Sequence, residues 1–302
     1  MLSEAALEAI RGFVSENNVK VNEPLANYTT FRIGGPAQCI IEISDEGQLT
    51  KVSRYLDMIE TPYMILGNGS NTLFPDSGYE GAILHICNEF SGVSVRGYEI
   101  TAKAGALLVS VSKIAQASGL TGLEFAAGIP GTVGGGVIMN AGAYGGEMSQ
   151  VVKQVRAISP KGEVVELDGS ALDFGYRKSV FKNSGFIVTE VVFKLSQGDP
   201  EKIQATMDEF NRRRREKQPL EYPSAGSTFK RPEGYFAGQL IMDAGLRGFQ
   251  IGGARISDKH CGFVINVNKA TAADVCDVIS EAQARVKDRF GVSLEPEIVI
   301  VK

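Results

Sequence analysis

Hydrophobic and polar positions in the first quarter of the chain recur at the spacings of alternating helices and strands. Apolar residues three and four positions apart indicate one face of a helix, whereas a short apolar run between turn residues indicates a buried strand. The elements that this pattern predicts are an amphipathic helix within 1–18, a strand over 38–43, a helix through 49–56 and a strand over 62–67. This part of the chain is therefore expected to mix helices and strands.

The middle of the chain is richer in strand patterns. Polar and apolar residues alternate about Arg96-Gly97, which predicts a hairpin. The segment Ser159-Pro160-Lys161-Gly162 predicts a second hairpin turn, because proline fixes one dihedral and glycine permits a positive φ. The predicted elements are a strand over 81–86, a hairpin over 93–105, a helix near 107–117, a hairpin of 151–158 with 163–168, and a strand over 186–195.

The pattern changes at residue 199, where a domain boundary is expected. Asp199 as N-cap and Pro200 at the first helical position predict a long helix that closes before Pro219. A later helix is expected from Thr271 to about Phe290, where Gly291 stops it. The other predicted elements are a helix around 236–246, strands around 249–256 and 262–267, and a last strand over 297–301.

Composition and charge favour a globular protein with small-molecule partners. The 302 residues are 43% hydrophobic, which is ordinary for a chain of two or three domains. The formal net charge of -4 gives no positive field for nucleic acid or an anionic membrane. We expect neither as a partner, and we expect a monomer.

Cysteine usage and hydropathy suggest a cytoplasmic location. The cysteines are far apart in the sequence and form no CxxC pair. The two histidines do not stand at the spacing of zinc ligands with them, so no metal is expected. No apolar run approaches the ~18 residues of a membrane span. The residues concerned are Cys39, Cys87, Cys261, Cys276, His85 and His260.

Two glycine-rich loops are the main candidates for a ligand site. The stretch 128–146 holds eight glycines. The two loops are "LGNGSNTLF" at 66–74, which follows a predicted strand, and "AGIPGTVGGGVIMNAG" at 127–142. Neither GxxxxGK[ST] nor GxGxxG is present, but bare backbone N–H groups can bind a diphosphate without lysine. Ser70, Asn71 and Thr132 could add side-chain donors. A single loop of this kind is more often only a tight turn between strands. Two such loops in one domain favour a ligand-binding site.

The two loops resemble a known flavoprotein fold. "PYMILGNGSNTLF" and "GLEFAAGIPGTVGGGVIMNAGAYGGE" are similar to the FAD-binding domain of the vanillyl-alcohol oxidase and p-cresol methylhydroxylase type. They resemble still more closely the UDP-N-acetylenolpyruvoylglucosamine reductase family. The resemblance extends in order over nearly the whole chain, through segments 28–37, 173–182, 217–232, 237–266 and 294–301.

The resemblance implies an α+β fold with a two-part FAD-binding domain, over 1–85 and 86–198, and a C-terminal α+β substrate-binding domain over 199–302. The last strand would return towards the active site. The uninterrupted "FGYRKSVFKNSGF" resembles the short class of the family, which lacks a tyrosine-bearing insertion. Noncovalent FAD is expected, because neither glycine loop holds His or Cys. The implied cofactor residues are Gly67, Asn68, Gly69, Ser70, Asn71, Thr72, Ile129, Pro130, Gly131, Thr132, Val133, Gly134, Gly135 and Arg214.

Three residues are implied to be catalytic: Arg177, Ser227 and Glu297. By its pattern alone, Arg177 reads as a surface arginine and Ser227 as a turn or N-cap residue. Glu297 could equally be a solvated strand end, with Glu295 on the same strand face. Chemically, however, a guanidinium fork suits a substrate carboxylate that gains charge. The resemblance makes Ser227 the proton donor.

Basic and aromatic residues near these positions are implied to bind substrate: Tyr176, Lys217 and Lys230. The run "NRRRREKQP" at 211–219 could alternatively be a solvated helix end, whose cations complement the helix dipole. His260 is interpreted as a hydrogen-bonded structural residue.

The reaction that the resemblance implies is the reduction of UDP-N-acetylglucosamine enolpyruvate to UDP-N-acetylmuramate, with FAD as cofactor and NADPH as co-substrate. This is a step of peptidoglycan precursor synthesis. Two alternatives remain: a sugar or alcohol oxidase of the same flavoprotein superfamily, and a flavin-binding module without catalysis.

Overall fold

A computed structural model describes residues 2–86 and 88–302, and it divides them into two compact units. Cys87, expected to be a free thiol, lies outside the described residues. Unit 1 holds the described residues up to Val21 with Cys39–Asn68 and Gly81–Arg214, and unit 2 holds Asn22–Gln38, Gly69–Glu80 and Arg215–Lys302.

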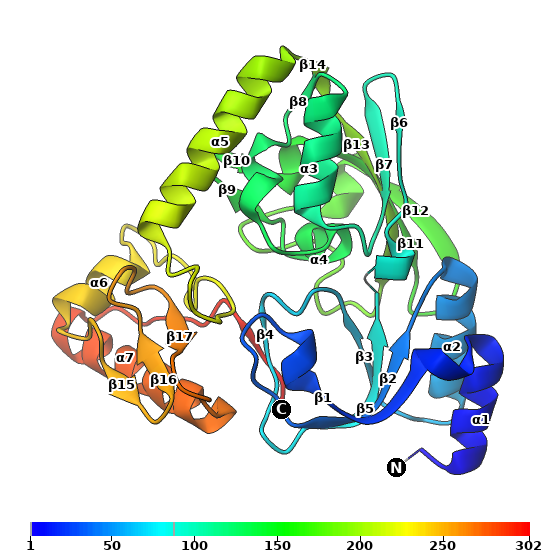
Figure 1. The fold of residues 1–302 in the computed structure, drawn as a ribbon, viewed down its shortest axis with the longest axis horizontal. Helices are drawn as coiled ribbons and strands as arrows, with labels where there is room; N and C mark the ends of the chain where they lie inside the picture. The colour runs from blue at the N-terminus through cyan, green and yellow to red at the C-terminus, as the bar shows by residue number, and fades with distance from the viewer. Residues whose placement is uncertain (1, 87) are drawn as a thin grey trace. The chain divides into compact units, whose positions relative to one another are not determined.

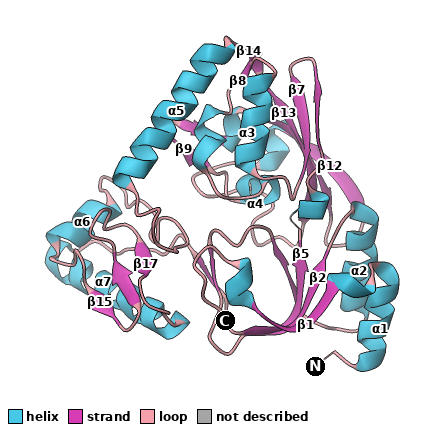
Figure 2. Ribbon diagram, viewed as in Figure 1, coloured by secondary structure: helices cyan, strands magenta, loops and turns pink. Residues whose placement is uncertain are grey.

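The centre of unit 1 is an antiparallel five-stranded sheet (Figure 2). Its two hairpins are those that the alternating patterns predicted, and Gly162 has the positive φ of 76° expected in the second turn. The helices α3 (Leu108–Ala117) and α4 (Val133–Ile138) contribute Val111, Ala115 and Val137 to its core. The strand order is β12 (Val164–Asp168), β11 (Val152–Ile158), β13 (Ile187–Lys194), β7 (Glu99–Lys103) and β6 (Val93–Arg96).

A four-stranded sheet carries the N-terminal pattern of strands and helices (Figure 1). Strands β3 and β5 pair in parallel. The helices α1 (Glu4–Phe13) and α2 (Glu46–Met58) pack beside it through the predicted apolar positions, which include Leu7, Leu49 and Leu56. The strand order is β1 (Val19–Pro24), β2 (Pro36–Glu42), β5 (Tyr79–His85) and β3 (Tyr63–Leu66).

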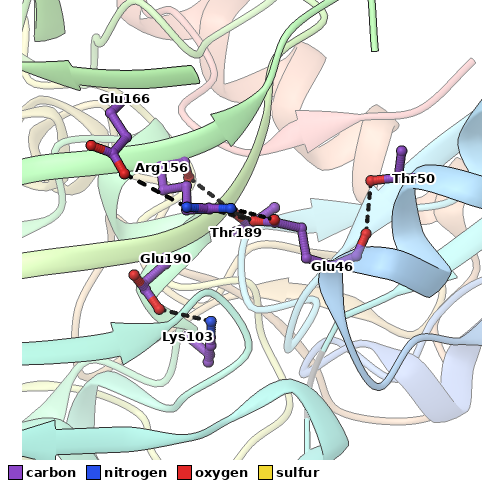
Figure 3. Close-up of polar contacts among 7 residues, drawn as sticks. All are labelled: Glu46, Thr50, Lys103, Arg156, Glu166, Thr189 and Glu190. Atoms are coloured by element: carbon purple, nitrogen blue, oxygen red, sulfur yellow. Dashed lines mark hydrogen bonds and ion pairs between the residues drawn. The ribbon is translucent and has the colours of Figure 1, made fainter. Parts of the chain in front are cut away.

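An ion-pair network ties α2 to the five-stranded sheet within unit 1 (Figure 3). The Arg156 guanidinium donates two hydrogen bonds of 2.9 Å to the Glu46 carboxylate, and the Thr189 hydroxyl adds one of 2.7 Å. The bond from Arg156 is the main reason that the pKa of Glu46 lies below its usual range. Lys103 pairs with Glu190 on the same sheet at 2.7 Å.

Unit 2 is built on an antiparallel sheet with two helices. The side chain of Thr271 caps the longer helix, and Gly291 ends it in the left-handed conformation, as the sequence predicted. Asp76 also accepts hydrogen bonds from the first two N–H groups of that helix. The elements are β15 (Gln250–Ile251), β16 (Ala254–Ile256), β17 (Val264–Asn266), α6 (Ala237–Asp243), α7 (Ala272–Phe290), and the parallel pair β4 (Thr72–Leu73) and β18 (Val299–Ile300).

The remaining elements are short, apart from α5 (Pro200–Lys217). As predicted, the Asp199 carboxylate accepts the N–H of Glu201 at the start of α5. The pattern did not predict β1 or α4. No helix in the described part of the chain is both long and apolar enough to span a membrane. The short strands pair as β8 (Leu120–Thr121) with β14 (Ser196–Gln197) and β9 (Gly142–Ala143) with β10 (Gly146–Glu147).

Candidate functional site

The two glycine loops meet within unit 1. The Asn68 side-chain amide donates to the carbonyl of Pro130 at 2.5 Å. Gly67 lies directly against the side chain of Thr132, so that a Cβ at Gly67 would overlap the Thr132 hydroxyl. Glycine is therefore needed at 67 because the second loop occupies the space of a side chain.

Much of the second loop is committed to the fold. The Thr132 hydroxyl caps α4 by accepting the N–H of Gly135 at 3.3 Å. The N–H groups of Val133 and Gly134 donate to the carbonyls of Ala106 and Ala104 at 2.8 and 2.9 Å. These three N–H groups are therefore used within the protein, and among residues 131–135 the N–H groups of Gly131 and Thr132 have no acceptor in the described residues.

The first loop keeps its donors free. Within the described residues, no acceptor receives the N–H groups of Gly67, Asn68, Gly69, Ser70 or Asn71. Successive N–H groups without acceptors can form a nest for an anion, because each group carries a partial positive charge. Backbone donors for a cofactor diphosphate are thus concentrated in this loop.

Arg214 lies beside Gly128, at the start of the glycine-rich segment. A Cβ added to Gly128 would stand 2.9 Å from the Arg214 Cδ. Its neighbours Arg212 and Arg213 instead pair with Glu209 at 2.8 and 2.7 Å, which fits a solvated helix face. Burial lowers the pKa of the Arg214 guanidinium, and no carboxylate in the described residues pairs with it. An anion such as a cofactor phosphate would offset the cost of that desolvation by its opposite charge.

Arg177 lies in a tight turn of unit 1. Gly175 and Lys178 exchange backbone hydrogen bonds of 3.0 and 3.1 Å across this turn, which places Tyr176 and Arg177 at its tip. Arg177 has a φ of +53°, a conformation that is uncommon for residues other than glycine. The exposed Tyr176 ring lies 5.1 Å from the guanidinium carbon. Backbone strain of this kind is common at functional sites.

Ser227 and Glu297 are brought together within unit 2. Ser227 is exposed between Gly226, whose φ is +75°, and the buried Thr228. The Glu297 N–H donates to the Thr228 carbonyl at 2.8 Å, and the Asn71 amide donates to the Glu297 carbonyl at 3.2 Å. The hydroxyl and the carboxylate thus belong to adjacent backbone segments. Glu297 precedes the short strand β18 rather than beginning it.

The basic candidates of unit 2 differ in their surroundings. The Lys230 ammonium pairs with Glu295 at 2.9 Å, and their backbones are bonded as well. Lys217 is exposed at the end of α5. A substrate phosphate that binds Lys230 would thus compete with Glu295 for the ammonium group. At Lys217 no carboxylate of the described residues would compete with it. His260 is structural as interpreted: its Nδ1 accepts the Gly262 N–H at 3.1 Å.

Two residues that hold or flank these turns could not be picked out from the sequence. Asn140 and Thr228 are 1% and 2% exposed: the Asn140 amide donates to the Gly175 carbonyl before Arg177, and the Thr228 hydroxyl, next to Ser227, accepts the N–H of Val264. Neither belongs to a periodic pattern. In residues 2–86 and 88–302 no three His, Cys, Asp or Glu side chains gather as a metal site would require.

The architecture and the loops place the chain in a class of FAD-binding proteins. Residues 37–168 match a family model described as an FAD binding domain. The solved structure of an alkyldihydroxyacetonephosphate synthase resembles 65% of this chain with a TM-score of 0.52 at 15% identity, which concerns the fold alone. The expected α+β fold with a flavoprotein domain is thus confirmed.

The C-terminal part of the chain narrows the class to one family. Residues 218–301 match the model of the UDP-N-acetylenolpyruvoylglucosamine reductase C-terminal domain. Reductases of that name from Lachnoclostridium phytofermentans and Pediococcus pentosaceus are 45% and 47% identical over 99% and 97% of this chain and 98% of their own. The crystal structure from Thermus caldophilus gives a TM-score of 0.81 at 36% identity, over 94% of this chain and 100% of that one. The chain belongs to the UDP-N-acetylenolpyruvoylglucosamine reductase family.

Proposed function

We propose that this protein reduces UDP-N-acetylglucosamine enolpyruvate to UDP-N-acetylmuramate with NADPH, through noncovalent FAD. The observation that carries the proposal is the match to reductases of that name along nearly the full length of both chains. The motif residues Arg177, Ser227 and Glu297 all stand in this sequence. The division into 1–85, 86–198 and 199–302 stays a prediction.

The residues of the glycine loops fit a dinucleotide cofactor. The first loop offers unpaired backbone N–H groups to a diphosphate, and Arg214 offers a half-buried cation beside Gly128. The close contact of Gly67 with Thr132 fixes the distance between the loops. When bound, FAD supplies the hydride chemistry, accepting from NADPH and donating to the enol ether.

Ser227 is proposed to give the proton that completes the reduction. Its hydroxyl is exposed at the tip of its turn, so a substrate carbon can approach it. A positioned donor is needed because a carbon that has just received negative charge must be protonated before the reaction reverses. Glu297, joined to the same turn through Thr228, is proposed to hold the hydroxyl in its donating orientation or to stabilise the charge.

Arg177 is proposed to bind the enolpyruvyl carboxylate. A guanidinium can form two parallel hydrogen bonds to a carboxylate, and it stabilises enolate charge that develops there. Tyr176, Lys217 and Lys230 are proposed to contact the substrate, with Lys217 at its diphosphate. The described thiols Cys39, Cys261 and Cys276 are unpaired, which supports the further proposal of a cytoplasmic location.

Turnover with defined substrates tests this function against its alternatives. The purified protein should be yellow, contain about one FAD per chain, and oxidise NADPH beyond one equivalent per FAD only when the enolpyruvyl nucleotide sugar is present. An oxidase would instead consume oxygen with a sugar or alcohol, and a flavin-binding module would carry FAD without turnover. Either result would overturn the proposal.

A further inference from the structure

The turn that carries Arg177 is held by a side chain to which no role has been assigned. Asn140 comes just after Met139, the C-cap of α4; it is 1% exposed and has a φ of +41°. Its amide nitrogen donates to the carbonyl of Gly175 at 3.0 Å, and its amide oxygen accepts the N–H of Ser149 at 2.9 Å. Both ends of this buried amide are therefore satisfied, one of them by the turn itself.

The Gly175 carbonyl is where the turn is fixed. It accepts the N–H of Lys178 at 3.1 Å in addition to the Asn140 amide, so two donors use its two lone pairs. A second anchor follows the turn, where the buried Ser179 hydroxyl donates to the carbonyl of Ile138 at 2.9 Å. Both anchors end at the last turn of α4 or just after it.

The same short helix begins in the cofactor loop. Thr132 caps its N-terminus and packs against Gly67, while Asn140 follows its C-terminus. All of these residues belong to unit 1. We infer that Asn140 is a positioning residue, which sets the place of Arg177 relative to the glycine loops through the Gly175 carbonyl. This inference rests on the proposed role of Arg177.

The conformation of Asn140 favours asparagine for this position. Asparagine tolerates positive φ, and its amide offers a donor and an acceptor on one short side chain. Aspartate has the same shape and a similar tolerance of positive φ. Its ionised carboxylate keeps the acceptor for Ser149 but sets a negative oxygen against the Gly175 carbonyl. Asn140→Asp thus replaces one hydrogen bond by a repulsive contact between two oxygens and, when ionised, adds a buried charge.

Half-reactions separate positioning from folding. Asn140→Asp should keep FAD and be reduced by NADPH within about twofold of the parent rate, because neither property uses Arg177. Reoxidation by the enolpyruvyl sugar should slow by about 10- to 100-fold, since a displacement of about 1 Å has costs of that order. The rate should recover towards about pH 5.5, because burial raises the pKa of a carboxyl and a protonated one can donate to Gly175.

A double-variant cycle with Arg177→Lys provides the decisive comparison. In that background Asn140→Asp should slow reoxidation by less than about twofold, because the two substitutions remove the same interaction. Ser112→Ala is the matched control: its buried hydroxyl donates to the carbonyl of Leu123 at 2.8 Å, apart from the turn, and its loss should leave reoxidation unchanged.

Distinct results overturn the inference and the proposed role of Arg177. Unchanged reoxidation in Asn140→Asp, with slow reoxidation in Arg177→Lys, would overturn the inference alone. Equal slowing of both half-reactions, or fully additive effects in the double variant, would make Asn140 only a structural residue and would also overturn it. Unchanged reoxidation in Arg177→Lys would remove the proposed role of Arg177, and the inference with it.

Discussion

The turns that carry Arg177 and Ser227 are held in place by different kinds of hydrogen bond. The turn in unit 1 has a strained tip, and buried side chains hold it from outside through the carbonyls of Gly175 and Ile138. The turn in unit 2 places its strain on glycine, at Gly226, and is held mainly by backbone bonds on both sides of Thr228. A hydrogen bond from a side chain can be removed by a single substitution, whereas a hydrogen bond between backbone groups remains after most substitutions.

This difference predicts which substitutions separate activity from stability. Ser227 is exposed and has no structural partner among the described residues, so its loss should affect only the reaction. Thr228 is buried and bonded at its N–H, its carbonyl and its hydroxyl, so its loss should affect the fold first.

The largest expected effect is that of Ser227→Ala on turnover. A positioned proton donor contributes typically about 10²- to 10⁴-fold in rate, and kcat should fall by that order. The unfolding temperature should stay that of the parent, because an exposed hydroxyl is removed. Steady-state kinetics and thermal unfolding check the two halves of this prediction. A variant that unfolds several degrees earlier would show that the serine supports its turn.

Arg177→Lys should have the next largest effect. Lysine keeps the charge but cannot form the paired hydrogen bonds of a guanidinium, so kcat should fall by about 10- to 100-fold. Steady-state kinetics with varied enolpyruvyl sugar, beside a flavin absorbance spectrum, provide the measurement. FAD content should remain at the parent level. Loss of FAD from this variant would instead place Arg177 at the cofactor.

Thr228→Val should reverse the pattern of Ser227→Ala. The Thr228 hydroxyl accepts the N–H of Val264 at 2.9 Å, and valine leaves that buried donor without a partner. Such a loss costs about 1–3 kcal/mol in the free energy of unfolding. Chemical denaturation measures this free energy, and Ser227→Ala, a substitution at the neighbouring residue, is the control. Equal stability of the two variants would contradict the view that Thr228 anchors the turn.

The smallest expected effect is a pH dependence through His260. Burial lowers the pKa of His260, and its unprotonated Nδ1 accepts the N–H of Gly262, whose carbonyl holds Thr228. The unfolded chain then binds the proton more readily, so stability is full above about pH 6.5 and falls as the pH drops below it.

His260→Asn supplies the comparison for this pH effect. Its amide oxygen can accept the same N–H but does not titrate. Between about pH 7.5 and pH 5.5 the unfolding temperature of the parent should drop by a few degrees more than that of the variant. If the unfolding temperatures of the parent and the variant change equally with pH, the titration of His260 does not cause the pH dependence.

Elements with local causes could be predicted from the sequence. The helix α7 is bounded by Thr271 and Gly291, whose capping geometry depends on neighbouring residues only, and the turn at Gly162 is equally local. In contrast, α4 begins with Val133 and three glycines, whose low helix propensity hides it. Thr132 and contacts with Ala104 and Ala106 stabilise it instead.

The candidate site was less accessible to sequence reasoning because its parts are distant along the chain. The amide of Asn140 reaches Gly175 across 35 positions, and that of Asn71 reaches Glu297 across 226. Nothing in the neighbourhood of Arg177 distinguishes it from a surface arginine, so its role came from the family resemblance. The N–H groups of 67–71 are free and those of 133–135 are paired because of the tertiary structure, and the composition of the loops does not show this difference.

Anaerobic stopped-flow absorbance of the flavin in Ser227→Ala tests the central claim, that this turn acts only after hydride transfer to the substrate. Reduction by NADPH should proceed at near the parent rate, because no proton reaches carbon in that half-reaction. Reoxidation by the enolpyruvyl sugar should fall by about 10²- to 10⁴-fold. If reduction by NADPH slows as strongly as reoxidation does, the serine positions the cofactor or supports the fold, and its assignment as proton donor is wrong.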